Sequence, residues 1–84
     1  MRPRMAAVVS DPAGIARRLT QLREGRGLSR HKLAWDLDVT DSALGHWERG
    51  QGVPSTYAVM KYAEYFGVTT DWILFGGSTD ADNG

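Results

Sequence analysis

The chain has 84 residues, ten of them basic and ten acidic, and it contains no cysteine. This length suits one small domain, and the absence of cysteine excludes disulfides and thiolate-bound metal. No apolar run approaches the roughly 18 residues that a membrane span requires. The composition therefore predicts a single soluble, cytoplasmic domain.

The net charge of zero conceals a division along the chain. Residues 1–35 carry eight basic and two acidic side chains, whereas residues 36–84 carry two basic and eight acidic ones. Such asymmetry favours a basic surface that faces a polyanion. Arginines that only contact solvent on helix faces would give the same composition.

The first half of the chain predicts three short helices. Asp11 and Pro12 suit the start of the first helix, and "GRG", residues 25–27, suits its end because glycine readily takes the left-handed conformation there. Ser29 is a good cap for a second helix, and Thr40 is a good cap for a third, which ends before the loop "GQGVPS".

The rest of the chain predicts two more helices. Ser55 caps a fourth helix that Gly67 ends, and "VTTDWILFGG" gives a capped last turn or two. No stretch alternates with period two, so the predicted fold class is all-α, a compact five-helix domain over residues 11–76. A flexible arm is expected over residues 1–10, and a disordered acidic tail over residues 77–84.

Only about three residues, "DVT", separate the second helix from the third, and so short a connection is typical of the helix-turn-helix arrangement. Around it stand "RRLTQLREGRGLSRHKLAWDLDVTDSALGHWERGQGVPS" and "AEYFGVTTDWILFG". In order and spacing these pieces resemble the small Cro/C1-type (XRE-like) helix-turn-helix repressors of phages and bacteria. The resemblance covers roughly residues 15–76 and implies a lambda-repressor-like fold.

The resemblance also implies one structural contact and a function. In that family, residues matching Arg23 and Glu48 form a structural ion pair between the first helix and the end of the third. The family binds double-stranded DNA, and a homodimer through the C-terminal helices would match an inverted-repeat operator. The leading hypothesis is therefore a sequence-specific transcriptional regulator, a repressor of phage or mobile-element type that acts without a cofactor.

The residues expected to contact DNA fall into two groups. The first lies at the N-terminus of the second helix, where backbone N–H groups and the helix dipole favour a phosphate: Ser29, Arg30 and Lys32, with His31 beside them. The second follows the third helix, whose N-terminal part would enter the major groove, and the loop after it: Thr40, Asp41, Ser42, Ala43, His46, Arg49 and Gln51. For the first group, a solvent-exposed helix turn without any contact to DNA is the alternative.

The residues of the third helix differ in the base contacts that their side chains can make. Ser42 can pair with either base type, Ala43 can pack against a thymine methyl, and His46 can donate to a guanine acceptor. Asp41 can accept from the N4 amine of cytosine, or it can stabilise its own helix N-terminus. Gly45 offers no donor, so it either permits close approach of the backbone to DNA or indicates that this face needs no contact.

Trp35 stands on the outer side of the second helix, where the family usually has a polar residue. It either marks a protein-partner surface or packs under "AAVV" of the N-terminal arm. With the neutral charge and the residues of the third helix, it favours an alternative function: an adaptor that inhibits or recruits a transcription-machinery protein. An antitoxin paired with a toxin is a third hypothesis. Enzymatic function is not expected, because the two histidines lack metal-ligand spacing and the acidic residues are scattered.

Overall fold

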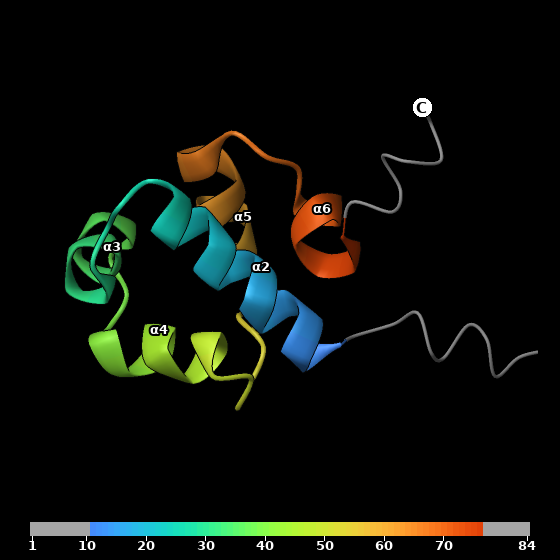
Figure 1. The fold of residues 1–84 in the computed structure, drawn as a ribbon, viewed down its shortest axis with the longest axis horizontal. Helices are drawn as coiled ribbons and strands as arrows, with labels where there is room; N and C mark the ends of the chain where they lie inside the picture. The colour runs from blue at the N-terminus through green and yellow to red at the C-terminus, as the bar shows by residue number, and fades with distance from the viewer. Residues whose placement is uncertain (1–10, 77–84) are drawn as a thin grey trace, which may run out of the picture.

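The computed structural model describes residues 11–76, which form five α-helices and no strand (Figure 1). The helices are α2 (Pro12–Gly25), α3 (Arg30–Leu37), α4 (Asp41–Glu48), α5 (Thr56–Phe66) and α6 (Thr70–Phe75). The predicted all-α fold class is confirmed. The arm and the tail expected at the two ends lie outside the described residues. Over residues 11–76, no helix combines the length and the apolar character needed to cross a membrane.

Hydroxyl side chains begin four of these five helices. Each accepts a hydrogen bond of 2.9–3.1 Å from the backbone N–H three residues later: Ser29, Thr40, Ser55 and Thr69. Such a cap satisfies one of the N–H groups that the first helical turn leaves without a partner and stabilises the helix by roughly 1 kcal/mol. Asp11 also precedes its helix, but its side chain makes no cap hydrogen bond. Pro12 occupies the first position of α2, where its fixed φ suits the start of a helix.

One apolar core fixes the helices relative to one another. Its buried residues are Ile15, Leu19, Leu33, Ala34, Leu37, Leu44, Val59, Tyr62, Phe66 and Ile73. In Figure 1, α2 runs through the middle of the molecule, and it packs against both α4 and α6. Full burial of a large apolar side chain contributes roughly 1.5–3 kcal/mol. Because α3 and α4 each contribute to this core, their relative position is set by packing and not by the turn alone.

Three basic side chains bind the carbonyl ends of neighbouring helices. Arg18 donates to the carbonyl oxygens of Ile73 and Leu74 at 2.7 and 2.9 Å, at the end of α6. Arg26 donates to the last carbonyls of α5 at 3.3 Å, and Lys61 donates to the Leu37 carbonyl of α3 at 2.7 Å. A cation is favourable at a helix C-terminus, where the carbonyl groups lack partners. Part of the positive charge in the first half of the chain is thus structural.

Candidate nucleic-acid interface

The turn between α3 and α4 has the short form that the sequence predicts. Asp38 adopts the left-handed conformation, with φ of 59°, and so ends α3. Its backbone N–H donates to the Trp35 carbonyl at 3.2 Å, and the N–H of Val39 donates to the Ala34 carbonyl at 3.0 Å. Figure 1 shows α3 almost end-on while α4 runs across the view, and the two helices pack against each other. This arrangement of two helices about a three-residue turn is a helix-turn-helix.

An ion pair between α2 and the end of α4 holds the second helix of this motif. Arg23 donates to both carboxylate oxygens of Glu48, at 2.8 and 3.0 Å, and also to the Leu28 carbonyl at 2.7 Å. The two side chains are only 10% and 4% exposed. The hydrogen bond to Glu48, opposed by burial, raises the pKa of Arg23. Because both charged groups are turned away from solvent, this ion pair holds α4 in place and is not available for contact with a ligand.

The N-terminus of α3 presents its predicted phosphate-binding residues at the surface. Ser29 accepts from the backbone N–H of Lys32, which caps the helix. The Arg30 side chain is 55% exposed, and its guanidinium lies 3.6 Å from Glu48. Lys32 lies 3.1 Å from Asp36, one turn further along α3. Both cations therefore keep exposed donors near the helix end while a carboxylate restrains each of them.

The outer face of α4 consists of polar side chains that begin directly after the Thr40 cap. Asp41, Ser42 and His46 are exposed, Ala43 is partly exposed, and Leu44 faces the core. Thr40 accepts from the Ala43 N–H. The exposed face therefore comprises the positions that the sequence predicts to read bases.

Asp41 has a partner that the sequence analysis did not predict. Its Oδ2 atom lies 3.0 Å from Nδ1 of His31, on the first turn of α3. The two side chains are 60% and 80% exposed, respectively. The nine residues between them in the sequence give no signal for this contact, which depends on the angle between α3 and α4. The first turns of both helices are thus connected by side chains at the surface.

The hydrogen bonding of His46 affects what it can read. Its Nδ1 lies 3.1 Å from the carbonyl oxygen of Ser42, which can only accept, so Nδ1 is assigned as the protonated nitrogen. In the neutral ring, Nε2 is then an acceptor. Neutral His46 in this tautomer accepts from a base amine, whereas donation to guanine requires the charged ring.

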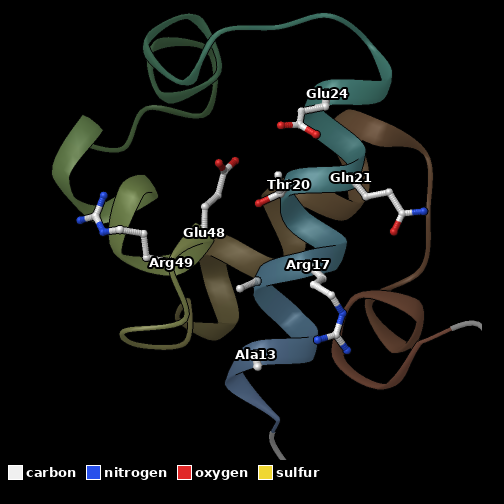
Figure 2. A pocket seen from close by; sticks show the side chains of 8 residues that line it. Ala13, Arg17, Thr20, Gln21, Glu24, Glu48 and Arg49 are labelled. Carbon is white, nitrogen blue, oxygen red and sulfur yellow. The ribbon is translucent and has the colours of Figure 1, made fainter.

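Gly45 leaves room for the side chain of Arg49. A Cβ atom at Gly45 would lie 2.9 Å from Nη1 of Arg49, so the guanidinium covers the glycine. Figure 2 shows Arg49 turned away from α2. Nε of Arg49 also donates to the Gln51 side chain at 3.3 Å. The two loop residues predicted to follow a phosphate strand therefore contact each other at the end of α4.

A groove separates α2 from the end of α4 (Figure 2). Its volume is about 520 Å³, and its lining combines both charges with small side chains: Ala13, Ala16, Arg17, Thr20, Gln21, Glu24, Glu48 and Arg49. Arg17 is exposed, whereas the neighbouring Arg18 is bound to the end of α6. Of these two adjacent arginines, only Arg17 is thus available to an external anion. Over residues 11–76, no cluster of three His, Asp or Glu side chains is placed to hold a metal ion.

Residues 15–72 match the protein family described as "Helix-turn-helix domain". The chain belongs to this family. It is 37% identical over 59 residues to the HTH-type transcriptional activator BcrR of Enterococcus faecalis. The matched stretch covers 70% of this chain and 29% of that protein. It is also 31% identical over 65 residues to the SPbeta prophage-derived uncharacterized HTH-type transcriptional regulator YonR of Bacillus subtilis (strain 168). This match covers 77% of this chain. The chain thus spans 29% and 60% of the lengths of these relatives. No solved structure shows significant similarity to it.

The helix-turn-helix domain exposes Trp35 on the outer side of α3. Its side chain is 78% exposed among the described residues. Packing of this ring under the N-terminal arm would involve residues outside the described range. Next to Trp35, Asp36 accepts from the hydroxyl of Tyr65 at 2.5 Å and from Lys32 at 3.1 Å, which connects α3 to α5. The exposed ring therefore stands beside a polar cluster that is internally paired.

A second apolar surface of the helix-turn-helix domain lies on α5 and α6. The exposed large side chains in this part of the chain are Val53 in the loop before α5, Tyr57 and Met60 on α5, and Phe75 at the end of α6. Beside them is a cavity of about 330 Å³ lined by Pro54, Thr56, Val59, Met60, Thr70 and Leu74. Of the exposed apolar side chains, Met60 borders this cavity, and exposed apolar side chains of this kind can mark an association surface.

Proposed function

We propose that the chain is a sequence-specific DNA-binding transcriptional regulator of the Cro/C1 (XRE-like) type. The observation that carries this proposal is the exposed polar face of α4, which begins directly after the Thr40 cap with Asp41, Ser42 and His46. A recognition helix places its N-terminal residues against base edges in the major groove. The relatives named as transcriptional regulators and the phage origin of one of them support the same function.

Phosphate contacts complete the proposed interface. Ser29, Arg30 and Lys32 lie on the neighbouring helix N-terminus, where an anion is favoured. Arg49 and Gln51 lie at the other end of α4. Contacts on both sides of the reading helix would fix its register on the duplex, while the α4 side chains supply the sequence preference.

We test this proposal by selection from genomic DNA fragments with the purified chain at about 50 and 200 mM salt. Wild type should recover one motif. Its affinity should fall steeply with salt, because the release of counterions on binding is less favourable at a higher salt concentration. Arg30→Ala should weaken binding to all sequences alike, whereas His46→Ala should relax the preference at particular positions. The proposal fails if no motif is recovered and binding at low salt is the same for any duplex.

Dimerisation through α5 and α6 belongs to the same proposal. Two-fold symmetry of the protein would match an inverted-repeat operator, and occupation of an operator within a promoter would repress it. Tyr57 and Met60, 68% and 53% exposed, would form the centre of the contact. Sedimentation should show a dimer that Met60→Asp dissociates and that Gln21→Asp, an exposed position on α2, leaves intact. A monomer that recovers only half-sites would contradict this part of the proposal.

The exposed ring of Trp35 favours a second candidate function, that of a protein-binding adaptor of the transcription machinery. Exposed tryptophan is frequent at the energetic centre of protein interfaces. This candidate predicts the opposite outcome in the DNA selection: no motif, and no steep salt dependence. Trp35→Ala would then abolish partner binding without loss of folding, whereas under the leading proposal it leaves the selected motif unchanged.

A further inference from the structure

Neither α3 nor α4 needs the contact between His31 and Asp41 as a cap. The N-terminus of α3 is capped by Ser29, and that of α4 is capped by Thr40. Both side chains of the pair are largely exposed, and both follow a cap within one turn. The contact therefore lies where two helix N-termini meet the solvent, on the face that carries the proposed DNA contacts.

The contact also orients the Asp41 carboxylate, because one of its oxygens is bound to His31. His31 Nδ1 and Asp41 Oδ2 are 3.0 Å apart, and the Asp41 side chain makes no other hydrogen bond to the described residues. A carboxylate has two oxygens and about four lone-pair directions. With one oxygen on His31, the other remains open to an external donor. The neighbouring cations have other partners, since Arg30 lies beside Glu48 and Lys32 beside Asp36.

Base chemistry then determines which donor fits. In the major groove, guanine and thymine present oxygen acceptors, which repel a carboxylate. Adenine presents an amine beside the N7 acceptor, whereas cytosine presents its N4 amine alone. A fixed carboxylate at the start of α4 therefore selects cytosine. The imidazole N–H also satisfies one oxygen of the carboxylate, so that only the other oxygen needs a donor on DNA.

We infer that His31 is a positioning residue that holds the Asp41 carboxylate for recognition of a cytosine N4 amine. This inference rests on the proposed function and deepens it by naming a specificity pair that spans both helices of the motif. The pair performs no chemistry. It converts a mobile acidic side chain, which DNA would repel, into an oriented acceptor.

The inference is tested by selecting DNA from a randomised duplex library with wild type, Asp41→Asn, His31→Ala and His31→Asn. Asp41→Asn should replace the cytosine preference at one position of each half-site by adenine, the base that asparagine reads. His31→Ala should reduce the preference for cytosine at that same position about fivefold to tenfold and leave the other positions unchanged. His31→Asn should restore most of it, because its amide nitrogen can donate from about the place of Nδ1.

Matched controls separate this effect from a loss of folding. Asp71→Asn removes an exposed carboxylate from the first turn of another capped helix, α6, and should leave the motif as in wild type. Circular dichroism should show the same helix content in every variant, because the two paired side chains are exposed.

The possible results distinguish the inference from the proposed function. If wild type selects no motif, both fail. If wild type selects a motif and His31→Ala keeps the cytosine preference, only the inference fails. If His31→Ala weakens binding to all sequences equally, His31 is a phosphate contact and not a positioning residue, which also overturns the inference.

Discussion

Arg23 and Glu48 are the one ion pair over residues 11–76 in which both side chains are almost buried. Their two hydrogen bonds of 2.8 and 3.0 Å join α2 to the last residue of α4. Tyr62 lies in the same part of the core, and its buried hydroxyl has no hydrogen-bond partner among the described residues. Burial, followed by the negative charge of Glu48, raises the pKa of Tyr62. The end of α4 is thus fixed by a charged contact inside an otherwise apolar environment.

Loss of one partner of this pair should destabilise the domain strongly. Glu48→Ala leaves the Arg23 guanidinium 10% exposed and without its carboxylate, and we expect the free energy of unfolding to fall by about 3 kcal/mol. Urea unfolding followed by tryptophan fluorescence measures this loss. Glu64→Ala, at an exposed position of α5, should change it by less than about 0.5 kcal/mol. The double variant Arg23→Met, Glu48→Met should lose less than the two single variants together, and simple additivity would contradict a direct coupling.

Adjacent arginines on α2 should differ in the same measurement. Arg18→Ala removes two hydrogen bonds to the end of α6, so we expect it to lower the free energy of unfolding by roughly 1–2 kcal/mol. Arg17→Ala removes an exposed side chain and should leave stability unchanged. Equal effects of the two substitutions would mean that Arg18 does not hold α6.

Local signals in the sequence predict the helices well. Ser29, Thr40 and Ser55 each cap the helix that follows, as expected, and the left-handed Gly67 ends α5. A cap acts over three residues, and an apolar stripe repeats every turn, so both can be read from neighbouring positions. Asp11 shows the limit of this reasoning, because a favourable residue type at the cap position does not ensure the hydrogen bond.

Contacts between distant segments could not be predicted in the same way. Arg18 binds carbonyls 55 and 56 residues later, and Lys61 binds one 24 residues earlier. His31 meets Asp41 only because of the angle at which α4 leaves the turn. The sequence shows a donor or an acceptor at each of these places, but the packing of the helices decides which two meet. Charge counts alone therefore overestimate the basic surface that is available to DNA.

The cluster of Asp36 and Tyr65 predicts how stability depends on pH. The hydrogen bond from Tyr65, followed by the one from Lys32, lowers the pKa of Asp36 below its ordinary value of 3.8. The hydrogen bond to Asp36, followed by burial, raises the pKa of Tyr65 above its ordinary value of 10.0. The carboxylate therefore stabilises the fold above about pH 3.8 and loses this effect as pH falls through its lowered pKa. The phenol stabilises the fold below about pH 10 and loses its effect as pH rises through its raised pKa.

Substitution of either residue should flatten this profile. In Tyr65→Phe, the urea midpoint should depend less on pH at both the acidic and the alkaline end, because one hydrogen bond shifts both pKa values. Asp36→Asn should have the same effect. Asp71→Asn serves as the comparison, since Asp71 is exposed and makes no such contact to residues 11–76. A profile of Tyr65→Phe that follows wild type at both ends would exclude the contact between α3 and α5 as the cause.

Salt dependence should separate the two groups of proposed DNA contacts. Arg30, 55% exposed at the start of α3, would neutralise one phosphate. Arg30→Ala should therefore make the slope of log affinity against log salt shallower by about 1. His46→Ala should keep the slope and lower only the ratio of specific to non-specific affinity. Titrations by fluorescence anisotropy over a range of salt concentrations measure both quantities, and a change of slope in His46→Ala would place that residue at a phosphate.

Gly45→Ala tests why a glycine stands in the middle of α4. Its backbone is helical, so alanine should stabilise the helix by up to about 1 kcal/mol. The new Cβ would meet Nη1 of Arg49 at 2.9 Å, but this is the far end of a flexible side chain and can move. Gly25→Ala, at the last residue of α2, is the comparison in which a new Cβ meets nothing within 4 Å. A more stable Gly45→Ala domain with weaker DNA binding would mean that the glycine admits DNA or places Arg49 against it. A more stable domain with unchanged binding would mean that this side of α4 does not touch the duplex, and the base contacts would then be restricted to the first turn of the helix.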